Sequence, residues 1–242
     1  MYININANIE EKINSKGYAL VSGSDIFINA ILYKDVLQFI DYYNKLEVDK
    51  YVLEKEKKPY RKRRYGGFTL DIKNGSLQIN EHKSFYQSNK VNKKYGGIKR
   101  TFAPIEQFIL NNKFLQTLIL EDFKKLPEKY KKNTSKWFIG VQLFRIETTN
   151  NYIGYPSPEG IHQDGHCFVI QHFINKSNIK GGKSLIYSLK KEKLLEATFK
   201  NFLDSCYVKD DMVMHDVTPI ECINQNKKGV RDMLILDFEI IK

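Results

Sequence analysis

A histidine and an aspartate that lie two residues apart, His162 and Asp164, have the types and spacing needed for metal chemistry. On an extended chain, side chains two residues apart point to the same face. A histidine and a carboxylate on one face can fill two adjacent positions on a single metal ion. Two histidines with one carboxylate are the usual ligands of non-haem Fe(II) oxygenases. The pair alone is a weak indication, because this spacing also arises by chance.

A third ligand must come from elsewhere in the chain. His166 continues the same spacing, but residues four apart on a strand are separated by about 13 Å, whereas ligand atoms lie about 2 Å from a metal. His172 is farther away still. We interpret both as strand residues that are satisfied by hydrogen bonds or solvent. His82 and His215 remain as candidates.

His215 lies in a run of strand-forming residues about 50 positions after the first pair. A Greek-key connection of that length can return a strand beside an earlier one. Arg231 follows at the start of the last apolar stretch. An arginine there is costly unless its guanidinium meets a carboxylate, and a salt bridge to Asp232 or another acid is the ordinary structural alternative. Together these residues form a sharper pattern than any one of them.

The elements that would position these residues change in character along the chain. Amphipathic helices are expected at 33–46 and at 112–124, where apolar residues recur at helical spacing. Strands separated by turn signals are expected at 137–147, 168–174, 185–189, 212–220 and 233–241.

The last of these strands is apolar on both faces, so it must be covered on both sides. We therefore expect a mostly β chain with flanking helices (α+β) and a jelly-roll, cupin-like core. It would form a single domain over residues 1–242, in which a helix-rich first half packs on a core that begins at about residue 137.

The formal net charge of +11 raises the question of nucleic acid, and seven basic residues cluster between Lys55 and Arg64. Our first interpretation of this run is a solvated loop. A positive funnel for acidic substrates and a footprint on a phosphate backbone are the alternatives. No recognition motif for nucleic acid accompanies the run, which argues against a nucleic-acid partner.

Cysteine content and hydropathy narrow the class of protein further. Three cysteines without CxxC spacing argue against both a disulfide framework and a thiolate zinc site. No apolar stretch reaches the roughly 18 residues of a membrane helix, so no membrane partner is expected. The N-terminus shows no secretory signal, and a cytoplasmic location is expected by default. A homo-oligomer is left open.

Eight short segments, spread over much of the chain, carry a further indication. They are 41–44, 85–88, 96–102, 140–145, 158–165, 181–184, 215–220 and 231–232. In order and spacing they resemble the 2-oxoglutarate/Fe(II) dioxygenase family of bacterial amino-acid hydroxylases, which includes L-isoleucine 4-hydroxylase.

The resemblance implies a double-stranded β-helix fold and a set of site residues. His162, Asp164 and His215 would be the catalytic residues that hold Fe(II), and Arg231 would bind the distal carboxylate of 2-oxoglutarate. The reaction implied is hydroxylation with O2, accompanied by release of succinate and CO2. The substrate implied is a small molecule, a free L-amino acid, with aliphatic amino acids ranked first.

Residues that contact the substrate are less well defined, and segment 47–80 departs most from the family. Gln142 and Arg145 lie three apart on one strand, so at most one of them points into the site. Arg145, or an arginine of the basic run, could hold a substrate carboxylate, and Glu159 could hold a substrate ammonium. For each of them an ordinary ion pair is the alternative.

Two other classes of protein remain. One is a cupin-like metal-binding protein without oxygenase activity. The other is a basic nucleic-acid-binding module, for which the run between Lys55 and Arg64 is the only support. Formation of succinate from 2-oxoglutarate would separate the oxygenase from both.

Overall fold

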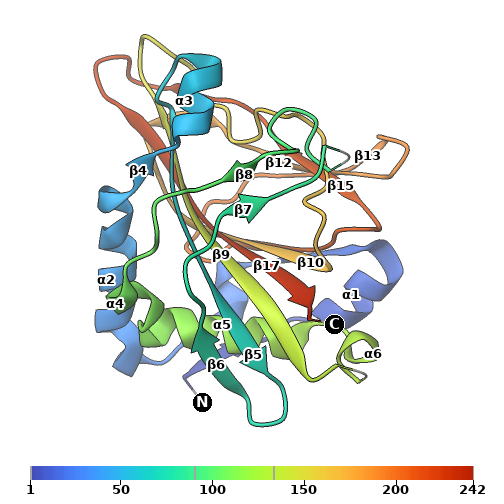
Figure 1. Cartoon of the computed structure of the whole chain (residues 1–242). Helices are drawn as coiled ribbons and strands as arrows, with labels where there is room; N and C mark the ends of the chain where they lie inside the picture. The colour runs from blue at the N-terminus through green and yellow to red at the C-terminus, as the bar shows by residue number, and fades with distance from the viewer. Residues whose placement is uncertain (1, 90, 133, 242) are drawn as a thin grey trace.

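A large antiparallel sheet is the central element of the computed structural model, which describes residues 2–89, 91–132 and 134–241. Its strand order is β2-β14-β10-β17-β9-β5-β4, and β6 also pairs with β5 (Figure 1). These strands are β2 (Tyr18–Val21), β4 (Glu47–Val48), β5 (Arg61–Asp71), β6 (Ser76–Ile79), β9 (Lys136–Thr148), β10 (Phe168–Ser177), β14 (Ser205–Lys209) and β17 (Gly229–Ile240).

Shorter strands form four smaller sheets. They are β1 (Ile3–Ile5) with β3 (Ile26–Ile28), β7 (Phe85–Tyr86) with β8 (Lys99–Arg100), β11 (Ile179–Gly181) with β16 (Ile220–Cys222), and β12 (Ser184–Tyr187) between β13 (Lys193–Ala197) and β15 (Met214–Val217).

The helices are α1 (Ile9–Lys16), α2 (Tyr33–Asp41), α3 (Lys50–Glu56), α4 (Gln107–Leu110), α5 (Lys113–Lys125) and α6 (Glu128–Lys131). Single 3-10 turns occur at η1 (Gly23–Asp25), η2 (Ala30–Leu32) and η3 (Tyr42–Lys45).

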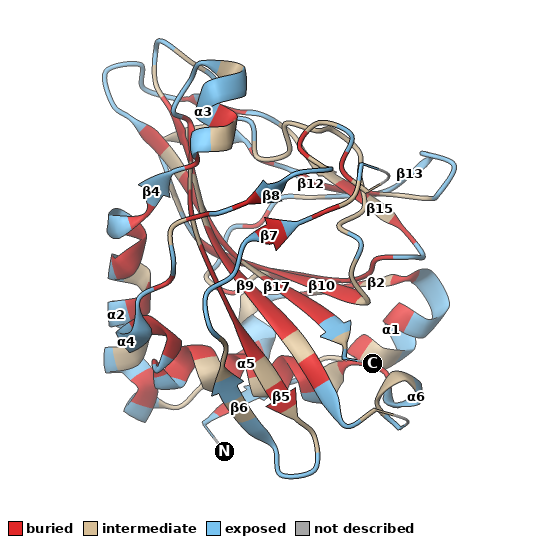
Figure 2. Ribbon diagram, in the orientation of Figure 1, coloured by how far each residue is buried: buried red, intermediate tan, exposed pale blue. Residues whose placement is uncertain are grey.

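Helix α5 covers one face of the large sheet (Figure 2). It begins after Asn112, whose side chain accepts a hydrogen bond from the backbone N–H of Leu115 at 3.1 Å, as expected for a cap. Its apolar side packs in one core with residues of β9 and β17 such as Leu143 and Leu234. The helix predicted at 112–124 is thus confirmed, and the one predicted at 33–46 is α2 followed by η3.

The opposite face of the large sheet packs against the β12 sheet. Val169 of β10 and Met233 of β17 share a second apolar cluster with Ile186 of β12. Strand β17 is therefore covered on both faces, which explains why it is apolar on both. This arrangement of a large and a small sheet is the jelly-roll core that the sequence predicted.

The first half of the chain contributes more to the sheet than we expected, since β2, β4 and β5 all precede residue 137. The interpretation of the basic run as a solvated loop is wrong for its second half. Lys55, at the end of helix α3, and the following Lys57 and Lys58 are exposed, whereas Arg61 to Arg64 open strand β5, with Arg61 only 5% and Arg63 only 4% exposed. A count of charges cannot reveal such burial, because carboxylates and aromatic rings elsewhere in the chain compensate these cations.

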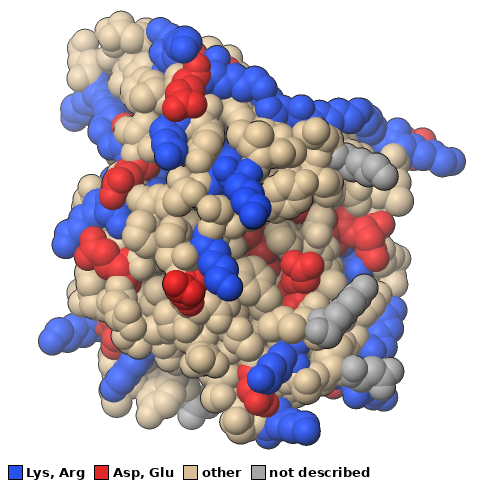
Figure 3. Space-filling model, in the orientation of Figure 1, with Lys and Arg blue, Asp and Glu red and all other residues tan. Residues whose placement is uncertain are grey.

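The remaining basic side chains do not gather into one patch on the visible face. Figure 3 shows Lys and Arg mixed with Asp and Glu there, with a row of basic residues along the upper edge. This distribution gives no support to a nucleic-acid footprint.

Candidate metal centre and active site

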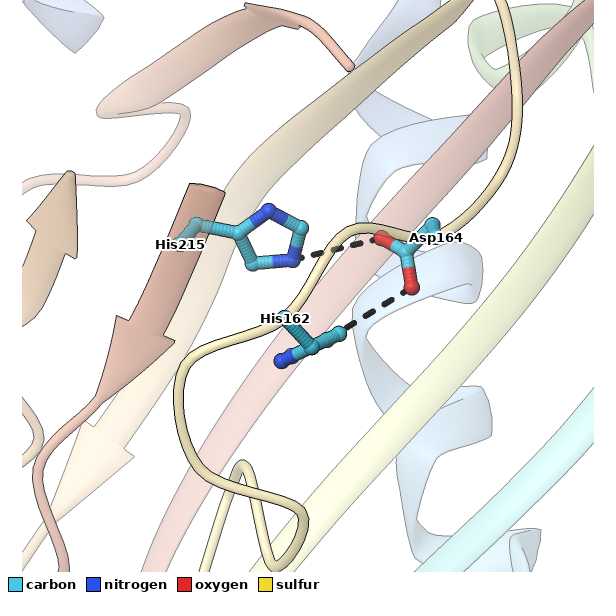
Figure 4. A group of neighbouring side chains, drawn as sticks. All are labelled: His162, Asp164 and His215. Atoms are coloured by element: carbon cyan, nitrogen blue, oxygen red, sulfur yellow. Dashed lines mark ion pairs between the residues drawn. The ribbon is translucent and has the colours of Figure 1, made fainter. Parts of the chain in front are cut away.

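The side chains of His162, Asp164 and His215 lie close together (Figure 4), and all three line one cavity. The Nε2 atom of His215 lies 3.2 Å from Oδ2 of Asp164, and Nε2 of His162 lies 3.6 Å from Oδ1. One ligand atom from each residue falls within 4.8 Å of the other two. A single metal ion could reach all three.

Backbone pairing brings the two histidines together. His215 lies in β15, and its N–H and C=O exchange hydrogen bonds of 2.9 and 3.0 Å with the backbone of His162. The return of a later strand beside the first pair is therefore confirmed. The segment around His162 is not a regular strand, however. Gly160 and Gly165 flank it with φ of +75° and +84°, a conformation that favours glycine.

The local hydrogen bonds prepare these side chains as ligands. Nδ1 of His162 donates to the carbonyl of Gly160 at 2.7 Å, which leaves Nε2 with its lone pair free. Burial alone would raise the pKa of Asp164, but His215 and His162 outweigh it and hold that pKa well below its usual range. The site thus offers one carboxylate and two imidazoles, a donor set that suits Fe(II).

Arg231 lies in the same cavity, on strand β17. Its side chain is 3% exposed, and its Nη2 has no hydrogen-bond partner among the described residues. Burial lowers its pKa to about 10, and Asp232 offsets this only in part. The alternative of an ion pair between Arg231 and Asp232 is wrong. The carboxylate of Asp232 lies on the opposite face of the sheet from the Arg231 side chain, and it binds Arg145 there. Arg231 is a buried cation that still lacks an anion.

Comparison with known proteins identifies the family of the chain. The model of the 2OG-Fe dioxygenase family matches residues 40–237. The chain belongs to this family. It is also 27% identical over 237 residues to 3(1)-hydroxy-L-isoleucine 4-dioxygenase of Pantoea ananatis, covering 94% of this chain and 93% of that enzyme.

Two solved structures share the fold of this family member. IDO from Bacillus thuringiensis has a TM-score of 0.77 at 21% identity, covering 96% of this chain and 94% of its own. A bsmA homologue from Methylobium petroleophilum has a TM-score of 0.81 at 21% identity, covering 98% and 97%. These likenesses confirm the predicted jelly-roll architecture.

Family membership also establishes the class of reaction. This dioxygenase is an oxidoreductase that uses Fe(II), 2-oxoglutarate and O2. Across the described ranges, no helix is long and apolar enough to cross a membrane.

The prediction that Arg145 contacts the substrate is wrong. Nε and Nη2 of Arg145 donate to the two carboxylate oxygens of Asp232 at 2.7 and 2.8 Å, and Nη1 donates to Asn44 at 2.8 Å. Alternation along β9 places Arg145 on the helix-covered face, away from the cavity. Its charge is already neutralised there.

Gln142, on the other face of β9, does line the dioxygenase cavity. Both ends of its amide are already engaged, since the oxygen accepts from Arg63 and Nε2 donates to Asp237 at 2.5 Å. Glu159 also lines the cavity. Its Oε1 accepts from Asn92 at 3.3 Å, whereas Oε2 is buried and lacks a partner within the described part of the chain.

The other histidines lie outside the cluster. His172 is fully buried between Asp122 and Ser205, at 2.8 and 2.7 Å, as expected of a residue satisfied by hydrogen bonds. Its Ser-His-Asp arrangement has no access to solvent and is structural. His82 contacts the carbonyl of Phe102 at 2.9 Å.

Arg100 is a cavity residue that the sequence analysis missed. It is 2% exposed and donates to Oε1 of Gln87 at 2.7 Å, while Nε2 of Gln87 donates to the backbone carbonyl of Asp164 at 3.1 Å. Gln87 and Arg100 lie in segments 85–88 and 96–102, which resemble the family, but the resemblance assigned no function to either residue. Their place beside Asp164 becomes clear only from contacts between segments that are distant in sequence.

Asp210 is a second missed residue, and nothing in its local sequence distinguishes it. Its carboxylate accepts hydrogen bonds from the backbone N–H of Asp164 at 3.0 Å and of Gly165 at 2.6 Å. These two bonds fix the turn that aims the Asp164 side chain. Asp210 therefore positions Asp164 within the candidate metal centre.

We expect Asp210→Asn to weaken Fe(II) affinity roughly 10–100-fold, the usual cost of losing a hydrogen bond that orients a ligand. An amide offers one oxygen instead of two, so one backbone N–H loses its acceptor. Metal titration of the purified protein measures the effect. Asp211→Asn is the matched control, because that side chain is 70% exposed. Equal affinities in the two variants would refute the positioning role.

Proposed function

We propose that this dioxygenase hydroxylates a free L-amino acid, with Fe(II) held by His162, Asp164 and His215 and the distal carboxylate of 2-oxoglutarate held by Arg231. The assignment of Arg231 to 2-oxoglutarate is supported by its buried Nη2, which is unpaired among the described residues. The assignment of the three residues to Fe(II) is supported by their donor set of two imidazoles and one carboxylate.

When bound, the iron would activate O2, the oxidant, which takes two electrons from 2-oxoglutarate (released as succinate and CO2) and two from the C–H bond that is hydroxylated. The protein residues bind, orient and exclude water. Arg231 anchors the far end of the cosubstrate from β17, so that its other end faces the three ligands. Apolar side chains such as Phe144, Met233 and Ile235 line the wall and keep the site dry. The same apolar side chains suit the carbon skeleton of an aliphatic amino acid, the substrate that the resemblance implies first.

Unpaired atoms of opposite charge support an amino-acid substrate. The buried Oε2 of Glu159 can accept from an ammonium, and the buried Nε atoms of Arg63 and Arg100, which are unpaired among the described residues, can donate to a carboxylate. All three side chains line one cavity. The relative from Pantoea ananatis is itself named for a hydroxylated L-isoleucine. With Arg145 engaged elsewhere, Arg63 and Arg100 take over the role that we expected of it.

Blocking either end of the substrate tests this proposal. We expect N-acetylated and amidated derivatives to lose at least about a hundredfold in kcat/KM, because each leaves a buried charge of the protein unpaired. Succinate formation and the gain of one oxygen by mass spectrometry measure turnover. Equal rates for free and blocked forms, or stimulation only by a peptide or nucleic acid, would refute the amino-acid assignment.

A further inference from the structure

Four buried arginines surround the cavity, which is more than the cosubstrate needs. Arg231 lies on β17, Arg61 and Arg63 lie on β5, and Arg100 lies on β8. Each is at most 5% exposed. An arginine stays charged at all ordinary pH values. The charge that surrounds the substrate is therefore set by how many carboxylates face these cations.

Arg61 is neutralised within the protein. Its Nε and Nη2 lie 3.0 and 2.9 Å from Oδ2 of Asp49, whose side chain is fully buried. Asp49 also accepts the N-terminal N–H groups of helix α3 from Tyr51 and Val52. Its carboxylate thus has little capacity left for another cation.

Arg63 and Arg100 have no carboxylate of their own. The nearest one to Arg63 is Asp49 at 3.9 Å, already engaged with Arg61. Within the described ranges, no carboxylate lies within 4.0 Å of Arg100. Burial, together with the neighbouring Arg61 and Arg100, lowers the pKa of Arg63 to about 9 despite the opposing effect of Asp49. Both cations are held at a cost in free energy.

Aromatic rings compensate only part of this cost. The guanidinium of Arg63 lies 3.5 Å from the ring centre of Phe102 and 4.6 Å from that of Phe144, and Arg100 lies 5.2 Å from that of Phe85. Such contacts stabilise a desolvated cation, but by less than the burial of an unpaired ion costs. An anion in the cavity would supply the difference.

Glu159 is the remaining carboxylate among the described residues that line the cavity, apart from the proposed ligand Asp164. Its Oε1 lies 3.8 Å from Nε2 of His162, and its Oε2 has no hydrogen-bond partner among those residues. As a metal ligand His162 would be a neutral imidazole, so it would not balance the charge of Glu159. Asp237, which accepts from Gln142, lies 3.8 Å from His166 and is balanced by it. Glu239 does not affect this balance, because its side chain is half exposed and its charge is screened by solvent. Apart from Arg231, the proposed metal ligands and the pair of Arg61 with Asp49, the described charged residues that line the cavity are therefore two unpaired cations, Arg63 and Arg100, and one carboxylate, Glu159.

An ordinary amino acid would not balance this arrangement. Its ammonium would neutralise Glu159 and its carboxylate one arginine, so that the second arginine would remain buried without a partner. A second carboxylate on the substrate would neutralise both. The charges around the proposed metal site already balance. The positive charges of Fe(II) and Arg231 equal the negative charges of Asp164 and of the two carboxylates of 2-oxoglutarate.

We propose that the substrate is an acidic L-amino acid, whose two carboxylates bind Arg63 and Arg100 and whose ammonium binds Glu159. This inference rests on the proposed function and specifies its substrate class. The apolar wall then contacts the methylene carbons between the charged groups, one of which faces the metal centre.

Isosteric pairs of amino acids that differ in one charge test the inference. We would assay the iron-loaded enzyme with L-aspartate and L-asparagine, L-glutamate and L-glutamine, L-2-aminoadipate, and neutral L-leucine, L-isoleucine and L-methionine. Succinate release and gain of one oxygen report turnover, and calorimetry without O2 reports binding. The preferred acid should exceed its amide, and every neutral aliphatic, by at least about a hundredfold in kcat/KM.

Variants connect this preference to the two arginines. Arg63→Gln and Arg100→Gln should each reduce the preference for acid over amide at least about tenfold, with Fe(II) and 2-oxoglutarate affinities retained. Arg64→Gln is the matched control, because Arg64 follows Arg63 on β5 but binds Glu47 at 2.8 Å outside the cavity. An unchanged preference in both Gln variants would overturn the assignment of the residues.

The outcomes for the two proposals are distinguishable. Hydroxylation of a neutral amino acid in preference to every acid would overturn the acidic-substrate inference and leave the proposed function intact. Suppose that the enzyme still binds Fe(II) and 2-oxoglutarate, but that no free amino acid raises the rate of succinate formation above background. That result would refute both the amino-acid assignment and the acidic-substrate inference.

Discussion

Replacing His215 by Ala should reduce Fe(II) affinity and turnover together, by at least about a hundredfold. Loss of a hydrogen bond that orients a ligand already costs roughly 10–100-fold, and this substitution removes the ligand itself. His162→Ala and Asp164→Ala should behave alike, because the three ligand atoms converge within 4.8 Å. Metal titration and succinate formation measure the two effects on the same preparation.

His82→Ala is the control for these variants. His82 is the other histidine that the sequence left as a candidate third ligand, and its ring contacts the carbonyl of Phe102 at 2.9 Å, outside the cluster. Its loss should leave Fe(II) affinity unchanged. Iron lost from His82→Ala and retained in His215→Ala would show that the ligand assignment is wrong.

Arg231→Met should raise the KM for 2-oxoglutarate at least about 30-fold, with much less effect on iron affinity. Truncating one partner of a buried, charge-assisted pair costs about 2–5 kcal/mol. The same substitution should leave the melting temperature of the cosubstrate-free protein unchanged or higher. An unpaired buried cation destabilises the fold, and an apolar side chain of similar volume does not.

The stability measurement separates a binding role from a structural one. If Arg231 formed an ion pair within the protein, its loss would destabilise the fold by about 3–5 kcal/mol and leave 2-oxoglutarate binding unaltered. Lys228→Ala is the matched control, since it removes one positive charge just before β17 from a side chain that is 51% exposed. It should leave both quantities near their wild-type values.

The metal centre could be predicted because each part of it leaves a local signature. The two-residue spacing of His162 and Asp164, a distal histidine in a strand-like run, and an arginine before the last apolar strand are all visible in the sequence. Exclusion of His166 by the rise of a strand assumed an extended segment, which the structure does not have there, but the cluster of the three residues still leaves out both His166 and His172. The structure brings the three proposed ligands together as this reasoning required, although an irregular loop with two positive-φ glycines carries the first two.

The substrate side could not be predicted in the same way. Arg145 and Arg63 are both arginines on central strands, and sequence does not reveal that Asp232 neutralises the first while the second has only a shared carboxylate at 3.9 Å. That difference depends on which face of the sheet meets the helices. Strand β5 also escaped notice, because its opening run of basic residues is typical of solvated surface.

The sequence by itself therefore indicated the jelly-roll class and the pairing of His162 with Asp164, through periodicity and spacing within short segments. The resemblance of other segments to the dioxygenase family selected His215 over His82 and implied a role for Arg231 toward 2-oxoglutarate. Only the tertiary structure decided which charges remain unpaired around the cavity, and that the carboxylate of Asp210 fixes the turn at Asp164. The reason is that pairing joins residues up to about a hundred positions apart, such as Arg145 with Asp232 and Gln142 with Asp237.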